Sequence, residues 1–162
     1  KINSYKKTFN YTLNILKLNS YKDENTVIFL DTPFYENKEL EQKRKNLIKK
    51  ISNKYRIIIV AHPRSFKLSL NTKNIYIWKG ETSILLEKFS KFLGIFTTLS
   101  IDLIQKNKLY ITCKYLRAKG YKCLDEELGA TKIAYNDIEV LKLLKTNPDI
   151  QSQKLFLKKL GF

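Results

Sequence analysis

The sequence contains no methionine, five glycines, three prolines, two cysteines and one histidine among its 162 residues. Such scarce glycine and proline exclude a collagen-like or proline-rich disordered chain. Cys113 and Cys123, with a single histidine, cannot supply the four ligands of a common structural zinc site, so two reduced thiols are the simplest interpretation. No apolar run reaches the roughly 20 residues of a transmembrane helix, and we expect no secretory leader.

The chain begins at Lys1 without a methionine. A translation product starts with methionine, and a large second residue normally blocks its removal. We therefore expect a fragment, the C-terminal part of a larger protein, with part of any active site outside it.

Positive charge dominates: 31 lysines and arginines stand against 15 aspartates and glutamates, a formal net charge of +16. Such an excess raises the local concentration of anions. Nucleic acid, an anionic membrane surface and a phosphate-bearing substrate all fit this charge, and the alternative is a solvated surface that reflects AT-rich codons. The lysines are not grouped in one basic run and no nucleic-acid motif is present, which argues against nucleic acid.

Apolar runs alternate with amphipathic stretches. Strands are predicted at 27–30, 56–61, 74–78, 92–96 and 109–112. Helices are predicted at 38–52, 81–91, 99–107, 136–145 and from Pro148 onwards. In the first of these helices, Arg44 and its lysine neighbours are expected to face water. The alternation predicts an α/β fold with a parallel sheet covered by helices. We expect 1–22 to be a connecting segment and 23–162 to form the domain.

Polar residues follow three of the predicted strands. The segments are Asp31-Thr32-Pro33, His62-Pro63-Arg64 and Thr97-Thr98. Open α/β sheets bind ligands outside the carboxyl ends of their strands, so these segments predict one shared site.

His62 is the only histidine, and Pro63 restricts its backbone to an extended pose. An imidazole there can donate a proton to a departing phosphate near neutral pH. Arg64 can add a charge-assisted contact. The alternative is a surface-loop histidine without a role.

Three further candidates have equally simple alternatives. Thr97 and Thr98 stand at a strand-to-helix turn, where hydroxyls and free N–H groups bind phosphate; alternatively Thr98 is a plain N-cap. Glu81 can bind both ribose hydroxyls, or it is a carboxylate that the first helical turn favours. Asp31 either contacts substrate or caps its turn.

The order of these features resembles the C-terminal half of bacterial sialyltransferases, most closely the lipooligosaccharide sialyltransferase family, glycosyltransferase family 52. The residues that carry the resemblance are 31–34, 59–64, Glu81 with Ile84, Leu85 and Leu86, and 94–100. The paired position holds threonines here, where the family pattern usually shows serines.

The resemblance implies a Rossmann-like parallel sheet with helices on both faces, one half of a GT-B fold, that binds the donor CMP-sialic acid. By this likeness His62 contacts the phosphate and protonates the leaving CMP. Thr97 and Thr98 would hold the phosphate oxygens. Glu81 would bind the ribose, and Pro63 would line the cytosine pocket.

The resemblance also implies inverting transfer to a galactose-ended lipooligosaccharide or glycan, without a cofactor or a divalent metal. The general base would be a carboxylate in an N-terminal half that this chain lacks, so the fragment alone is expected to be inactive. The expected location is cytoplasmic, peripheral on the inner face of the inner membrane, and a homodimer is compatible.

Other functions stay open. One is another GT-B transferase with a CDP- or UDP-linked donor, such as an enzyme that moves glycerol phosphate onto a wall polymer. Another is a non-enzymatic, basic nucleic-acid-binding module.

Overall fold

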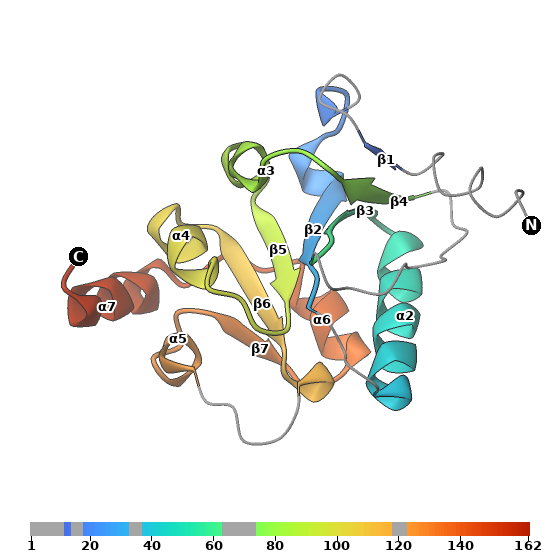
Figure 1. Cartoon of the computed structure of the whole chain (residues 1–162). Helices are drawn as coiled ribbons and strands as arrows, with labels where there is room; N and C mark the ends of the chain where they lie inside the picture. Colours follow the sequence, from blue (N-terminus) through green and yellow to red (C-terminus); the bar gives the residue numbers. More distant parts are fainter. Residues whose placement is uncertain (1–11, 14–17, 33–36, 63–73, 118–122) are drawn as a thin grey trace, which may run out of the picture.

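The computed structural model describes residues 12–13, 18–32, 37–62, 74–117 and 123–162. In this part of the chain, seven strands form one sheet in the order β1-β4-β3-β2-β5-β6-β7, and every neighbouring pair is parallel (Figure 1). The strands are β1 (Thr12–Leu13), β2 (Thr26–Leu30), β3 (Arg56–Val60), β4 (Ile75–Trp78), β5 (Lys91–Gly94), β6 (Leu109–Cys113) and β7 (Lys132–Ala134). The α-helices are α2 (Lys38–Ser52), α3 (Thr82–Lys88), α4 (Ser100–Gln105), α5 (Leu124–Glu127), α6 (Asp137–Leu143) and α7 (Ile150–Leu160).

Helices cover both faces of the sheet, as the alternating pattern predicts. Side chains of a strand point alternately to its two faces, so a strand with two apolar faces divides its residues between two cores. Phe29 of β2 packs in a core with α2 and α6, whereas its neighbour Ile28 packs in a second core with α3 and Leu103 of α4. All residues of β2 are buried, which explains why the run 27–30 is continuously apolar.

The strand order reverses between β2 and β5. From β2 the chain steps outward to β3 and β4, and then returns to the other side of β2 to place β5, β6 and β7. Such a reversal splays the loops that leave the two strands and opens a crevice at their carboxyl ends. This switch point therefore lies between Leu30 of β2 and Gly94 of β5, which are paired in register.

Several helix boundaries agree with the sequence pattern. The helix predicted at 38–52 is α2, and Asn37 caps it by accepting the backbone N–H of Leu40 at 3.0 Å. Asn136 caps α6 in the same way, through the N–H of Glu139 at 2.9 Å. These caps bind an amide within the first helical turn, so a local pattern suffices to find them.

Other boundaries differ. Thr98 is not an N-cap, because α4 begins at Ser100 and it is the hydroxyl of Thr97 that accepts the N–H of Leu99, at 3.2 Å. The last helix begins after Asp149, whose carboxylate accepts the N–H of Ser152 at 3.1 Å, rather than at Pro148. The carboxylate of Asp149 accepts from both the amide and the hydroxyl of Ser152, whereas a proline side chain offers no acceptor.

The short elements β1, β7 and α5 were not expected. β1 lies inside the segment 1–22 and pairs with β4, and Leu18 of the same segment is 1% exposed. This part of the segment therefore docks on the sheet. Within the described residues, none of the helices has the length and apolar character of a transmembrane span.

Candidate functional site

The sequence-derived site residues follow four neighbouring strands. His62 comes after β3, Glu81 after β4, and Thr97 and Thr98 after β5, while Asp31 follows β2 between them. Because the strands are parallel, all five residues lie at one edge of the sheet, around the switch point. Pro63 and Arg64 lie outside the described residues. The structure thus brings the described candidates to the same edge, although it assigns no ligand to any of them.

The candidates differ in exposure. His62, Glu81 and Thr98 are exposed, and Thr97 is half-buried. Glu81 precedes the first residue of α3, and its backbone carbonyl accepts the indole N–H of Trp78 at 3.1 Å. Its side chain does not cap the helix; the exposed carboxylate accepts a hydrogen bond from the hydroxyl of Ser83 at 3.4 Å. These side chains are accessible to a ligand at the carboxyl edge.

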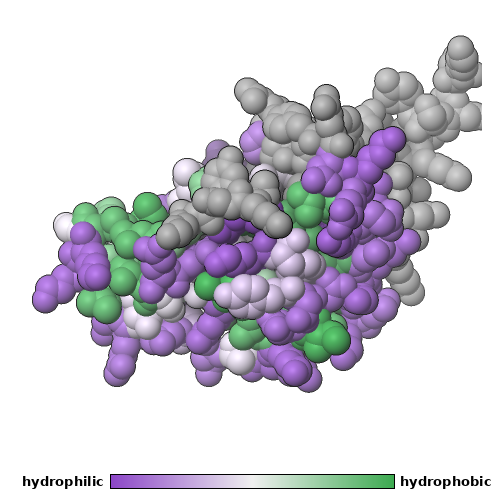
Figure 2. Space-filling model, turned by 90° about the horizontal axis from the view of Figure 1, so that it is seen from below, coloured by the Kyte–Doolittle hydropathy of each residue, from purple (hydrophilic) through white to green (hydrophobic). Residues whose placement is uncertain are grey.

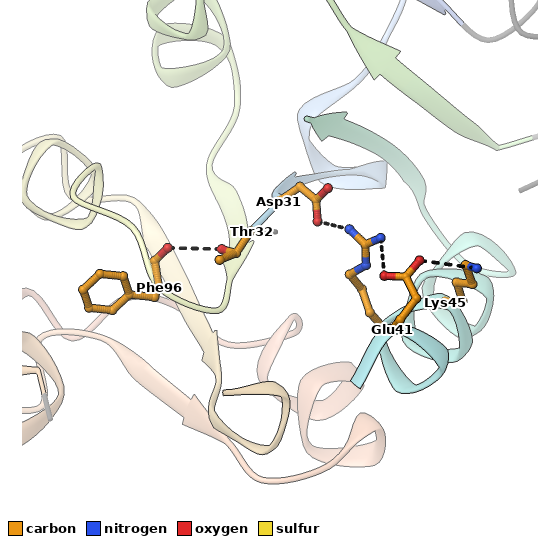
Figure 3. A network of polar contacts seen from close by, with 6 residues as sticks. Asp31, Thr32, Glu41, Lys45 and Phe96 are labelled. Carbon is orange, nitrogen blue, oxygen red and sulfur yellow. Dashed lines mark hydrogen bonds and ion pairs between the residues drawn. The ribbon is translucent and has the colours of Figure 1, made fainter. Parts of the chain in front are cut away.

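Asp31 is different, because its side chain is buried in an ion pair with Arg44 (Figure 3). The side chains of Asp31 and Arg44 are 0% and 1% exposed. Arg44 also donates from Nη2 to Glu41 at 2.7 Å, and Glu41 pairs with Lys45 at 3.3 Å. This network ties the end of β2 to the first half of α2. The carboxylate of Asp31 thus has a structural partner in Arg44. Contact between Asp31 and a substrate stays a prediction.

The expectation that Arg44 faces water is wrong. Arg44 stands four residues after Leu40 and four before Ile48, so it occupies the core-facing stripe of α2. A buried guanidinium requires a carboxylate partner, since an unpaired buried charge is costly. Asp31, thirteen residues earlier, supplies that partner across the β2–α2 connection. Only the tertiary fold brings the two groups together.

The loop after β5, which carries Thr97 and Thr98, is held from both sides. The hydroxyl of Thr32, after β2, donates to the carbonyl of Phe96 at 3.3 Å (Figure 3). Arg117, after β6, donates to the carbonyl of Ile95 from Nε at 3.0 Å and from Nη2 at 2.7 Å. Two consecutive peptide carbonyls directly before Thr97 are therefore bound by side chains from the neighbouring strands.

Arg117 is in turn held by Glu126 of α5. Its Nη2 donates to the carboxylate of Glu126, and the two side chains are only 5% and 4% exposed. The guanidinium also lies over the ring of Phe96, 5.9 Å from its centroid. Arg117 and Glu126 were not among the site residues predicted from the sequence. The available signal was an arginine shortly after an apolar strand, followed by the acidic run Asp125-Glu126-Glu127.

A cavity of about 280 Å³ adjoins Thr97 and Thr98. It lies between the loop after β5 and helices α4, α5 and α7. Apolar side chains of Phe96, Leu124, Phe156 and Leu160 line it together with the polar residues Thr112, Arg117, Asp125 and Glu126. A cavity of this size is at the small end of ligand-binding sites. Its mixed lining suits a compact polar group with an apolar side.

Titratable groups beside the cavity have shifted pKa values. Burial raises the pKa of the Asp125 carboxyl, and the negative charge of Glu126 raises it further. Burial likewise raises the pKa of the Cys123 thiol, although the charge of Arg117 opposes this. The deeper Cys113 thiol has a pKa raised to about 12, again chiefly by burial. Both thiols are free in the structure, and their raised pKa values disfavour the nucleophilic thiolate form.

Within the described residues, no group of three or more His, Cys, Asp or Glu side chains is placed to hold a metal ion. The candidates at the shared edge of the sheet are hydroxyls, an imidazole and a carboxylate. Hydroxyl and imidazole donors bind phosphate oxygens, and a solvent-facing carboxylate accepts hydrogen bonds from sugar hydroxyls.

No family model and no curated protein matches the sequence. Several solved structures are similar in fold. The wall teichoic acid polymerase TagF has a TM-score of 0.56 and 17% identity over 90% of this chain and 40% of its own length. The UDP-GlcNAc 2-epimerase from Methanocaldococcus jannaschii has a TM-score of 0.61 and 17% identity, over 90% of this chain and 48% of its own. MnaA from S. aureus, solved with UDP, has a TM-score of 0.62 and 11% identity, over 94% and 49%.

These likenesses define the class of fold. The parallel sheet covered by helices on both faces is a Rossmann-like domain, one half of a GT-B fold. The chain spans less than half the length of each of these three proteins.

Proposed function

We propose that this chain is the donor-binding half of a GT-B transferase that uses a nucleotide-linked donor. One observation carries the proposal: His62, Glu81 and the Thr97-Thr98 pair lie at the carboxyl ends of neighbouring strands around the β2/β5 switch point. That edge is where open α/β sheets bind their ligands. The residue types there match the parts of a nucleotide.

Each part of a donor has a candidate partner. The imidazole of His62 contacts the phosphate and protonates the departing nucleotide. The hydroxyls of Thr97 and Thr98 bind phosphate oxygens, on a loop whose preceding carbonyls are held by Thr32 and Arg117. Glu81 accepts the ribose hydroxyls. The formal charge of +16 favours an anionic donor without help from a divalent metal.

The similar structures support a CDP- or UDP-linked donor. TagF has been solved with CDPG and MnaA with UDP, and the UDP-GlcNAc 2-epimerase is named for its uridine nucleotide sugar. The second candidate donor is CMP-sialic acid, which the order His62-Pro63, Glu81 and Thr97-Thr98 favours through its resemblance to sialyltransferases. Both donors share a phosphate, a ribose and an anionic charge, so the same residues serve either.

The acceptor and the general base complete the proposal. A galactose-ended or wall-polymer acceptor would be activated by a carboxylate outside this chain. The chain spans less than half the length of TagF and of the UDP-GlcNAc 2-epimerase. The transferase would act in the cytoplasm, at the inner face of the membrane where lipid-linked acceptors are exposed.

Calorimetric titration of the chain with CMP, CDP, UDP and short single-stranded DNA tests the donor site. We expect a nucleotide to bind, and His62→Ala to weaken it about tenfold through loss of one charge-assisted contact. Asn147→Ala, at an exposed residue between α6 and α7, is the matched control and leaves the affinity unchanged. Salt-sensitive DNA binding without a nucleotide signal would overturn the proposal.

Donor choice and the place of the base need a second measurement. CMP-sialic acid, CDP-glycerol and UDP-GlcNAc are compared as ligands, and the isolated chain is assayed with a galactose-ended acceptor. We expect binding without turnover. Turnover would show that the base lies within this chain.

A further inference from the structure

Apolar side chains are exposed at the end of the molecule formed by α7. Leu155 is 49% exposed, Leu160 40% and Phe162 69%, and Leu124 on the adjoining α5 is 44% exposed. We call these four residues the α7 surface. Figure 2 shows apolar side chains gathered at this end of the molecule, among hydrophilic ones. Single exposed leucines are ordinary, but a cluster over two adjoining helices marks an interaction surface.

Lysines are interleaved with this surface. Lys154, Lys158 and Lys159 are exposed on the same helix, and none of them forms an ion pair with the described residues. α7 itself carries no acidic residue between Ile150 and Leu160. The outward side of α7 therefore presents uncompensated positive charge beside large apolar groups.

The helix is a fixed platform for these side chains. Its inner side is anchored by Phe156, 3% exposed, and by Gln153, whose amide donates to the carbonyl of Lys108 at 3.0 Å. At its end Gly161 adopts a left-handed conformation with φ of +87°, which terminates the helix and leads to the exposed Phe162. The outward side is therefore held in one orientation by the fold.

We propose that the α7 surface docks on an anionic lipid bilayer. Leu155, Leu160 and Phe162 would insert at the boundary of headgroups and acyl chains, while the lysines contact lipid phosphates. Insertion of apolar side chains and attraction of lysines to anionic lipid are the two contributions that bind a protein surface to the membrane interface. A nucleic-acid partner accounts for the lysines but leaves the leucines and Phe162 exposed, because such interfaces are polar.

The proposal goes beyond donor binding and has a consequence for it. Leu124 and Leu160 also line the cavity that adjoins Thr97 and Thr98. Docking through the α7 surface would therefore bring this edge of the candidate site to the lipid headgroups. An acceptor carried on a lipid would meet the donor there.

Vesicle co-sedimentation tests the docking. The chain is mixed with vesicles of phosphatidylglycerol and phosphatidylcholine, with pure phosphatidylcholine vesicles, and with single-stranded DNA as competitor. We expect binding to the anionic vesicles only. Leu155→Ser with Phe162→Ser should weaken it at least about tenfold, and each of Lys154→Gln and Lys158→Gln by a factor of about five.

Helix α6 and the residues next to its two ends provide matched controls. Tyr135 and Ile138 are 59% and 64% exposed, and Lys142 and Lys145 are exposed lysines of the same region. Tyr135→Ser with Ile138→Ser, and Lys142→Gln with Lys145→Gln, should leave vesicle binding within about twofold of the unchanged chain. Circular dichroism confirms that every variant is folded.

Four outcomes would overturn the proposal. Three are absence of binding to anionic vesicles, equal losses from the α6 and α7 variants, and loss from the lysine variants alone, which indicates unspecific charge attraction. The fourth is displacement of the vesicles by DNA to the same extent from wild type and from the α7 variants. Nucleotide titration of the α7 variants keeps the two proposals apart. If no nucleotide binds, the proposed donor site is wrong, but the vesicle-binding result still stands.

Discussion

Arg117 donates two hydrogen bonds to the carbonyl oxygen of Ile95, from Nε at 3.0 Å and from Nη2 at 2.7 Å. Ile95 stands two residues before Thr97, and the carbonyl of the residue between them is bound by Thr32 at 3.3 Å. The loop that presents the two threonines is thus held by side chains from β2 on one side and from the β6 end on the other. The loop is therefore preorganised in the absence of a ligand, and this reduces the entropy cost of binding.

Replacing Arg117 should therefore destabilise the protein strongly. Arg117→Met leaves the carboxylate of Glu126 buried without its partner, and breaking such a pair costs about 3–5 kcal/mol. Urea unfolding followed by circular dichroism measures the loss of unfolding free energy. Lys106→Met, which removes an exposed ion pair with Glu87, is the control and should change little. Equal effects of the two substitutions would contradict a structural role for Arg117.

The Asp31–Arg44 pair should behave in the same way. Either Asp31→Asn or Arg44→Met leaves one buried group without its charge partner and should cost about 3–5 kcal/mol of unfolding free energy. The double variant should cost less than the sum of both, because each single variant already removes the shared interaction. A stable Asp31→Asn variant with weakened nucleotide binding would instead support substrate contact by Asp31.

Stability should depend on the ionisation of Asp125. Burial raises the pKa of this carboxyl above its unfolded value, so between the two values the folded protein binds more protons than the unfolded chain. The free energy of unfolding then falls as the pH rises from the unfolded pKa through the folded pKa. Asp125→Asn removes this loss, and its stability relative to wild type should increase as the pH rises from the unfolded pKa of about 4 through the folded pKa.

Urea unfolding of wild type and Asp125→Asn across that pH range checks the slope. Asp102→Asn, an exposed aspartate on α4, is the control. A constant difference between wild type and Asp125→Asn at all pH values would show that the carboxyl titrates alike in both states.

Gly94 at the end of β5 should not tolerate a larger residue. A Cβ atom there would lie 2.6 Å from the hydroxyl oxygen of Tyr110, whose ring is 2% exposed. Gly94→Ala should cost about 1–3 kcal/mol, because the buried ring has little room to move. Adding Tyr110→Phe removes the clashing oxygen and should recover part of the loss. Thermal unfolding of the three variants measures this, and a double variant less stable than the sum of both would contradict it.

The elements that sequence reasoning predicted are those with long or strongly patterned signals. The helix 38–52 has apolar residues at helical spacing and a local cap at Asn37, so its bounds agree with α2. The runs at 27–30 and 56–61 are apolar because both faces of β2 and β3 are covered. The short β1, β7 and α5 have too few residues for any periodicity, and pairing with neighbours in space decides them.

The two buried arginines could not be predicted from the sequence for a different reason. Arg44 and Arg117 were not among the candidates, since a charged residue in a sequence is ordinarily expected at the surface. Their partners lie 13 and 9 residues away along the chain. Only the packing of α2 on β2, and of α5 beside the β6 end, shows which carboxylate each guanidinium meets.

The sequence by itself determined the class of this protein, a parallel α/β sheet with polar residues directly after its strands. Hydrophobic periodicity and caps are local properties, and they decide which segments become strands and helices. Only the tertiary structure decided the strand order, and with it that His62, Glu81 and Thr97 follow strands on the two sides of the reversal between β2 and β5. It also decided that Asp31 is buried against Arg44, because burial depends on what packs against a residue and not on its neighbours in the chain.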